Sequence, residues 1–176
     1  EFCPEDYDSI ELFRKTEYEN LGIIRAATKF FALPGIRLGY GCTSKKMARK
    51  IERIQLPWSI NALAKVAGNY IFHDKKYIEE SKRYIEKERN YLLKELSNIK
   101  FMKPYFTNAN YILIQLLDLE EEEIFDFLLS RGILIRKCSS FNGLNYNFIR
   151  LAIKDRKNNS RLVEILKEFE KEELEK

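Results

Sequence analysis

Cysteine and histidine are both scarce in this chain of 176 residues. The three cysteines, Cys3, Cys42 and Cys138, are odd in number and far apart, which fits neither a disulfide framework nor the paired spacing of a zinc site. We therefore expect no metal site and a reducing, cytoplasmic environment. The single histidine, His73, has no carboxylate and nucleophile arranged around it, so we interpret it as a surface helix residue.

Long apolar runs and concentrated charge are also missing. No apolar stretch approaches the ~20 residues needed to cross a bilayer, and the acidic start "EFCPEDYDS" has no signal-peptide character. The net charge of +4 is small and scattered, with no basic run interleaved with aromatic residues. A Gly-rich loop of the P-loop or dinucleotide-binding type is missing too. We expect no membrane association and no nucleic-acid partner.

The hydrophobic content of 45% is enough for a buried core, and its pattern is that of an α/β protein. Strands are predicted at 20–27, with Leu21 to Ile24 buried, and at 36–44, 109–116, 132–138 and 147–153. Helices are predicted from 45 to a stop at Pro57, from 61 to 96 with a bend near Gly68, at 119–130, and from about 158. The last two strands are expected side by side, and helices against such a sheet form a small sandwich.

Caps and apolar stripes define these helices. Asp118 with Glu121 is a capping-box-like start for the helix 119–130, and Gly132 closes that helix. The last helix has three candidate N-caps, Asn158, Asn159 and Ser160. Its apolar stripe consists of Leu162, Ile165, Leu166 and Phe169, and that of the long helix consists of Ile78, Ile85, Leu92, Leu96 and Ile99.

Lys29 is one lysine within the apolar stretch "AATKFFALPGIRLGYG" (26–41). A lysine that is partly desolvated has a lowered pKa and becomes a usable nucleophile. An ordinary exposed lysine at a strand end would give the same pattern. Arg37, eight positions later, can fork onto a phosphate or can be structural.

Arg136 and Arg150 share one feature, because each stands within an apolar strand run, "GILIR" and "NFIRLAI". A charge in such a place is costly unless it is paired. The two guanidiniums either converge on an anionic substrate or form ion pairs with carboxylates. In "PWSINALA" (57–64), Trp58 is interpreted as a packing aromatic at a helix start.

Together these stretches resemble pyridoxal-phosphate enzymes of the aspartate aminotransferase fold. The lysine segment "RAATKFFALPGIRLGY", then "PWSINALA", "GILIRKCSSF" and "NFIRLAI" occur in the order of that family. Within it they are similar to the branch of threonine-phosphate decarboxylase and histidinol-phosphate aminotransferase. The resemblance implies an α/β fold: residues 1–56 as part of the large cofactor-binding domain, 57–97 as a long connecting helical region, and 98–176 as a small α/β domain.

The resemblance also implies roles for individual residues. Lys29 would form the internal aldimine with pyridoxal 5'-phosphate, Arg37 would clamp the cofactor phosphate, and Thr28 would contribute a hydroxyl. Arg150 would hold a substrate carboxylate, and Arg136 would be a second anion-recognising arginine. The substrate would be a small amino-acid phosphate, and the full-length protein would be a homodimer.

Two departures from the family pattern stand out. Ala26 stands where the family usually has a hydroxyl residue, so one hydrogen bond to the cofactor phosphate should be missing or replaced. Only about 28 residues precede Lys29, whereas the family carries the acid, the stacking aromatic and the phosphate loop for the cofactor further upstream. We therefore expect this chain to be the C-terminal portion of a longer enzyme, with little activity alone.

The sequence leaves three hypotheses for the function: two reactions and one non-catalytic role. "IRKCSSFNGL" in particular looks more like threonine-phosphate decarboxylase, in cobalamin synthesis, than like histidinol-phosphate aminotransferase. Decarboxylation is thus the first expectation and transamination the alternative. The third hypothesis is a catalytically incompetent fragment or interaction module with a vestigial lysine.

Overall fold

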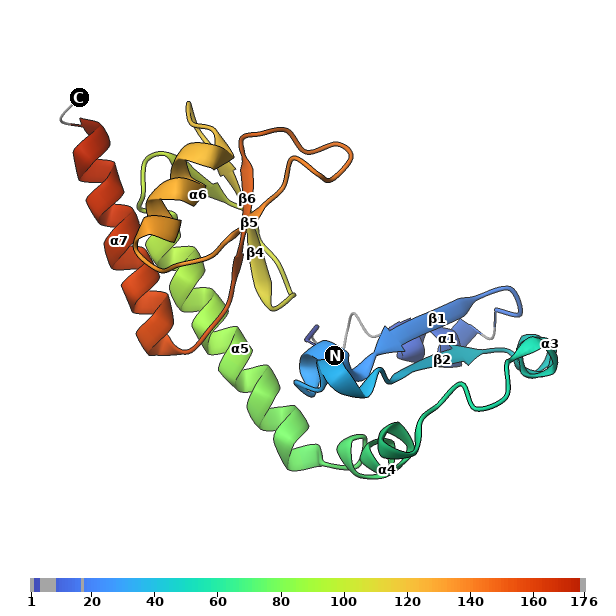
Figure 1. The fold of residues 1–176 in the computed structure, drawn as a ribbon. Helices are drawn as coiled ribbons and strands as arrows, with labels where there is room; N and C mark the ends of the chain where they lie inside the picture. The colour runs from blue at the N-terminus through green and yellow to red at the C-terminus, as the bar shows by residue number, and fades with distance from the viewer. Residues whose placement is uncertain (1, 4–8, 17, 175–176) are drawn as a thin grey trace. The chain divides into compact units, whose positions relative to one another are not determined.

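The computed structural model describes residues 2–3, 9–16 and 18–174, and places them in two compact units. The first unit is Cys3–Lys82, and the second is Arg83–Lys176 together with Phe2. Figure 1 follows the chain from its blue N-terminal part to its red C-terminal helix. Among the described residues, no helix is both long and apolar enough to span a membrane.

The first unit contains a two-stranded antiparallel sheet, β1 (Gly22–Ala26) with β2 (Gly39–Thr43). Its helices are α1 (Ser9–Thr16), the single turn α2 (Ala27–Phe30), the 3-10 turn Pro34–Ile36, α3 (Lys45–Ile54) and α4 (Ala62–Ile71). The prediction of a helix from residue 45 to the stop at Pro57 is confirmed. The prediction that Leu21 to Ile24 is buried is wrong: Ile24 is 89% exposed, because β1 pairs only with β2 and no described layer covers Ile24.

Gly39 is required where the two strands approach most closely. A Cβ on Gly39 would lie 2.9 Å from the backbone oxygen of Arg25, whereas a Cβ on Gly41 would lie at an ordinary 3.7 Å from that of Ile23. We expect Gly39→Ala to lower the free energy of unfolding by about 1–3 kcal/mol, the usual cost of overpacking. Gly41→Ala is the matched control. Equal denaturation midpoints for the two variants would contradict this account of Gly39.

The predicted single helix 61–96 is two helices. α4 ends at Ile71, and α5 (Lys75–Leu96) begins after Asp74, whose carboxylate accepts a hydrogen bond from the amide of Tyr77. The chain thus breaks at 72–74 rather than bending at Gly68. Gly68 has a packing role instead, since a Cβ there would lie 3.3 Å from Leu38 Cδ2. His73 is exposed as expected, but it lies in this connection and not in a helix.

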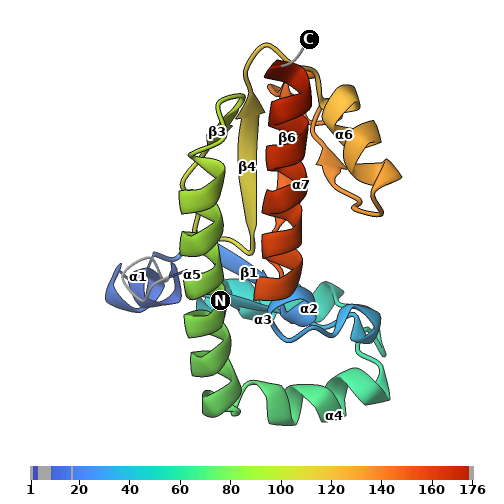
Figure 2. The same ribbon diagram turned by 90° about the vertical axis from the view of Figure 1, so that its left-hand side faces the viewer.

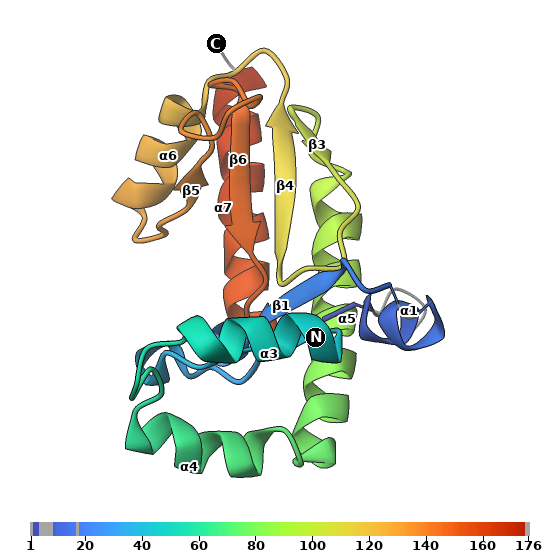
Figure 3. The ribbon, with the colours of Figure 1, turned by 90° about the vertical axis from the view of Figure 1, so that its right-hand side faces the viewer.

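The second unit is built on a four-stranded antiparallel sheet in the order β3-β4-β6-β5. Its strands are β3 (Met102–Pro104), β4 (Tyr111–Leu116), β5 (Arg136–Lys137) and β6 (Phe148–Ala152). In this unit α5, α6 (Glu121–Ser130) and α7 (Arg156–Leu174) lie on one side of the sheet (Figures 1 and 2). Figure 3 shows the opposite face, with β4, β6 and β5 toward the viewer. This face is called the open face below.

Most of the strand predictions for this unit are confirmed, with differences in length. β4 and β6 lie within the predicted runs 109–116 and 147–153, and β5 pairs with β6 as expected. β5 is only two residues long instead of 132–138, because Ile133 still bonds back to Leu128 at the end of α6. β3 was not predicted, since its three residues include a proline.

The core of the second unit fills the space between the sheet and its helices. It includes Ile112, Ile114 and Leu116 of β4 and Ile149 and Leu151 of β6, which alternate with residues of the open face. The predicted stripe of the last helix is confirmed: Leu162, Ile165, Leu166 and Phe169 are all buried.

The helix starts differ from those predicted. α6 is capped by Glu120, in a capping box with Glu123, and Asp118 instead adopts a left-handed conformation at φ 58°. α7 begins at Arg156 because Asp155 accepts a hydrogen bond from the amide of Asn158. The end of α6 is as predicted, with Gly132 at φ 74°.

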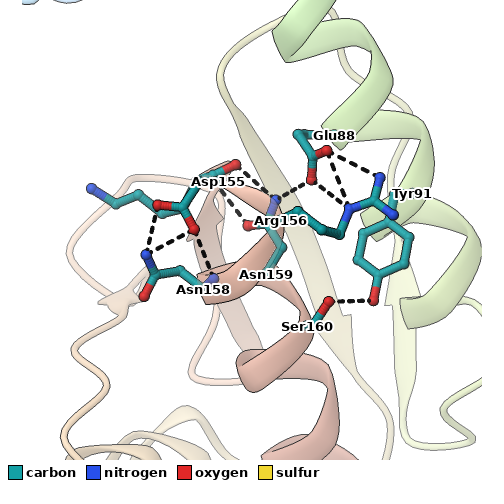
Figure 4. A network of polar contacts seen from close by, with 8 residues as sticks. Glu88, Tyr91, Asp155, Arg156, Asn158, Asn159 and Ser160 are labelled. Atoms are coloured by element: carbon teal, nitrogen blue, oxygen red, sulfur yellow. Dashed lines mark hydrogen bonds and ion pairs between the residues drawn. The ribbon is translucent and has the colours of Figure 1, made fainter.

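A network of charged and amide groups joins α5 to the start of α7 (Figure 4). The side chain of Glu88 is 3% exposed and accepts hydrogen bonds from Arg156 Nε and Nη2 at 3.0 Å. Asn159 Nδ2 donates to Glu88 Oε2 at 3.0 Å, and the Arg156 guanidinium lies 3.8 Å from the ring centre of Tyr91. Both oxygens of the buried Glu88 carboxylate thus accept hydrogen bonds.

Candidate functional site

Lys29 projects from α2, the single helical turn that directly follows β1 in the segment joining β1 to β2. Its neighbours Thr28 and Phe30 are buried while Lys29 is exposed, so the turn packs one side and presents the lysine to solvent. The backbone oxygen of Phe30 accepts a hydrogen bond from the Tyr77 hydroxyl at 2.9 Å. The apolar surroundings therefore fix the backbone of Lys29 rather than desolvating its ammonium.

Thr28, the residue before the lysine, carries a buried hydroxyl without a partner. Thr28 is 8% exposed, and within the described part of the chain its Oγ1 makes no hydrogen bond. Buried hydroxyls normally have a hydrogen-bond partner, because leaving one unpaired costs about 1–3 kcal/mol. An unpaired hydroxyl beside an exposed lysine is what a site for an absent polar group would contain.

Arg37 belongs to the same connection. Ala26 pairs with Gly39, so residues 27–38 leave and re-enter the sheet at one end, and the structure brings Lys29, Thr28 and Arg37 into one loop. Arg37 follows the 3-10 turn in a left-handed conformation at φ 59°, and its exposed guanidinium donates to the oxygen of Pro34 at 3.2 Å. Ala26 is the last residue of β1 and is exposed, with no hydroxyl to offer.

Arg136 and Arg150 lie directly opposite each other on β5 and β6. Arg150 stands between Ile149 and Leu151, which face the helices, so alternation places it on the open face. Lys137 contacts Glu122 of α6, so its neighbour Arg136 also faces away from the helices. Two guanidiniums in register repel each other unless something offsets their charge.

Aromatic rings, not carboxylates, contact these arginines. The guanidinium of Arg150 lies 4.6 Å from the ring centre of Tyr111, and that of Arg136 lies 5.3 Å from the ring centre of Phe141. Arg136 also donates to Ser140 Oγ at 3.0 Å. No ion pair from either arginine to a described carboxylate is present. The interpretation of the two as ion-paired residues thus has no support among the described residues.

Two residues near this pair, Glu121 and Cys138, were not predicted from the sequence to belong to a site. Glu121 is 2% exposed, and its Oε2 accepts hydrogen bonds from the amides of Cys138 and Ser139. Burial raises the pKa of the Cys138 thiol, and the charge of Glu121 adds to this, while Arg150 and Arg136 oppose it. The sequence indicated Glu121 only as part of a helix cap. Three further glutamates adjoin it, so only the fold shows which one is buried.

The site residues thus form two groups, one in each unit. Lys29, Thr28 and Arg37 belong to the first unit, and Arg136 and Arg150 belong to the second. Each group carries positive charge and hydrogen-bond donors, which suits phosphate or carboxylate groups.

The chain is similar in sequence and in structure to known proteins. A protein of Caldanaerobacter subterraneus subsp. tengcongensis with the provisional name threonine-phosphate decarboxylase is 38% identical over 92% of this chain and 43% of its own length. The crystal structure of histidinol-phosphate aminotransferase from Clostridium acetobutylicum is 40% identical, with a TM-score of 0.91 over 97% of this chain and 51% of its own.

A third, more distant protein shares the fold. The histidinol-phosphate aminotransferase of Sinorhizobium meliloti, solved in complex with pyridoxal-5'-phosphate, matches with a TM-score of 0.72 at 19% identity, over 86% of this chain and 42% of its own. The chain thus spans about half the length of the relatives it matches. The model of the family "Aminotransferase class I and II" matches residues 1–166. This chain therefore belongs to the class I and II aminotransferase family.

Proposed function

We propose that this chain supplies the cofactor lysine and the substrate arginines of a pyridoxal-phosphate-dependent enzyme acting on an amino-acid phosphate. The observation that carries the proposal is the β1–β2 connection, where an exposed lysine adjoins a buried hydroxyl that has no hydrogen-bond partner among the described residues. Arg37 in the same connection adds a guanidinium. These residues fit a cofactor with an aldehyde and a phosphate, which need an amine and hydrogen-bond donors respectively.

Each residue of the connection has a separate task in this proposal. The amine of Lys29 would hold the cofactor aldehyde and would accept or donate a proton at Nζ. The Thr28 hydroxyl and the Arg37 guanidinium hold the phosphate, with Ala26 making no side-chain bond to it. When bound, pyridoxal phosphate supplies an electron sink for the bond that breaks.

Arg136 and Arg150 are proposed to bind and orient the anionic groups of the substrate. Their register and their lack of a carboxylate partner in the described chain support this role. Orientation decides the chemistry, because either a carboxylate or a proton can leave from the same carbon. Decarboxylation of threonine phosphate is the first candidate, as the local resemblance of "IRKCSSFNGL" favours it.

Transamination of histidinol phosphate is the second candidate. It is supported by the 40% identity to the Clostridium acetobutylicum aminotransferase. The full-length protein should be incubated with threonine phosphate while carbon dioxide is measured, and separately with histidinol phosphate and 2-oxoglutarate while glutamate is measured. Carbon dioxide release supports the first candidate, and turnover of histidinol phosphate alone would overturn it.

The anion site can be tested on the 176-residue chain itself. We expect Arg150→Gln to weaken the binding of inorganic phosphate about tenfold to a hundredfold, because a charge-assisted hydrogen bond contributes about 1.5–3 kcal/mol. Arg83→Gln is the matched control, since Arg83 is an exposed arginine on α5. The measurement is a phosphate titration followed by amide chemical shifts. Equal affinities for the two variants would argue against the site.

We also infer that the full-length protein is a homodimer and that this chain alone has little activity. In the first unit, apolar side chains around α3 and α4 are strongly exposed, including Ile54 at 79%, Trp58 at 85% and Leu63 at 71%. Trp58 is therefore not the packing aromatic expected from the sequence. An apolar surface of this kind is typical of an interface, and a second copy is the partner that the family resemblance implies.

A further inference from the structure

Glu121 is a buried carboxylate that binds backbone amides instead of a cation. It is the first residue of α6 and is 2% exposed. Its Oε2 accepts a hydrogen bond from the amide of Cys138 at 2.5 Å and from the amide of Ser139 at 3.2 Å. Burying a carboxylate is costly, so such bonds must compensate for its lost hydration.

Capping of α6 does not explain this arrangement. The N-terminus of α6 already has its capping box, formed by Glu120 and Glu123. Glu122 of the same turn forms an exposed ion pair with Lys137. Surface pairs of this kind contribute little. The two bonds of Glu121 therefore hold the segment after β5 and not the helix.

That segment holds the side-chain partners of Arg136. The amide of Phe141 bonds the oxygen of Cys138 at 2.9 Å, which closes a turn over residues 138–141. Ser140 Oγ of this turn accepts from Arg136 Nη2 at 3.0 Å, and the Phe141 ring centre lies 5.3 Å from the guanidinium. β5 itself is only two residues long, so its ladder alone fixes Arg136 weakly.

We propose that Glu121 is a positioning residue that fixes the turn 138–141 and thereby holds the Arg136 guanidinium in place for the phosphate or carboxylate group of the substrate. Glu121 itself does not touch the substrate. The proposal rests on the proposed function, because it is Arg136 that binds the anion.

The test compares three substitutions in the 176-residue chain. Glu121→Ala removes both bonds, and Glu121→Gln keeps a side-chain oxygen that can accept them. Asp126→Ala removes an exposed carboxylate of the same helix and is the control for charge. If Glu121→Ala does not fold, Glu121→Asp replaces it, because the shorter side chain keeps the charge but cannot reach both amides.

The first readout does not depend on substrate. Hydrogen exchange of the Cys138 and Ser139 amides, and the Arg136 Nε–H signal by NMR, report the turn and the guanidinium directly. We expect Glu121→Ala to speed exchange at both amides and to broaden or shift the Arg136 signal, with Glu121→Gln and Asp126→Ala close to the wild type. Unchanged exchange and an unchanged Arg136 signal in Glu121→Ala would overturn the proposal.

The second readout is the affinity for inorganic phosphate. Glu121→Ala is expected to lower it about fivefold to tenfold, as two hydrogen bonds are lost, and Glu121→Gln to stay within about twofold. The variant Arg136→Gln separates the anion site of the proposed function from the positioning role of Glu121. If it binds phosphate as well as the wild type does, the anion site of the proposed function is wrong, while the first readout still decides the role of Glu121. If it binds weakly but Glu121→Ala binds normally, the positioning role is wrong.

Discussion

Substituting Lys29 by alanine is expected to abolish the covalent attachment of pyridoxal phosphate to the full-length protein. The variant should lose the borohydride-reducible linkage, and turnover should fall by about three orders of magnitude or more, since no other group would replace the nucleophile. Exposure of Lys29 supports this, because the amine can be reached without unfolding the turn. The measurement is the mass of the protein after incubation with cofactor and reduction.

Two control variants separate chemistry from charge. Lys29→Arg keeps a cation at the same place but has no amine that forms such a linkage, so it should behave like Lys29→Ala. Lys65→Ala removes an exposed lysine of α4 and should keep the full adduct. An adduct of unchanged yield in Lys29→Ala would show that the cofactor is held elsewhere.

Substituting Glu88 by alanine is expected to be the most destabilising of the changes considered, at about 3 kcal/mol. The change removes the carboxylate that binds Arg156 and Asn159 and leaves Asn159, which is 1% exposed, with an unmade hydrogen bond. The value is at the lower end for a buried pair, because the side chain of Arg156 is 48% exposed and can be rehydrated. Chemical denaturation measures the loss, with Glu86→Ala of the exposed face of α5 as control.

The same pair predicts a dependence on pH. Hydrogen bonding from Arg156 lowers the pKa of Glu88, against the opposing effect of burial and with help from Asn159. The pKa is therefore lower in the folded chain than in the unfolded chain. The stabilisation is complete above the ordinary glutamate pKa and is lost as the pH falls through the lowered folded value.

Denaturation at successive pH values checks this sign. The difference in unfolding free energy between the wild type and Glu88→Ala should be largest near neutral pH and should shrink as the pH falls below the ordinary glutamate range. A difference that stays constant, or grows, toward acid pH would contradict the assignment of the buried charge.

Residue spacing and proline positions along the chain predicted several helices correctly. The helix after residue 45 and its stop before Pro57 follow from spacing and from proline geometry, and the stripe of α7 follows from its period. Glu88 stands three residues after Ile85 and four before Leu92, so the helical period places it beside the apolar stripe, but the period does not identify the group that pairs with its charge. Its partner Arg156 is 68 positions away, so only the tertiary fold shows the pair. Arg89 beside it is also buried, and its Nε and Nη1 have no partner among the described residues.

In the candidate site, too, the sequence predicted individual residues, whereas their arrangement follows only from the fold. The apolar runs around Arg136 and Arg150 marked both residues as unusual, but their register across β5 and β6 could only come from the sheet. The resemblance pointed to Thr28, whereas its unpaired hydroxyl is a property of the folded turn. Glu121 differs from its neighbours only in burial, which the acidic run does not reveal.

Mapping the reduced cofactor onto the peptides of the unsubstituted protein tests the central claim most directly. The full-length protein is incubated with pyridoxal phosphate, reduced with borohydride and digested, and the modified lysine is located by mass spectrometry. The account predicts one stoichiometric modification, on Lys29. A modification spread over several exposed lysines, or one that spares Lys29, would contradict it.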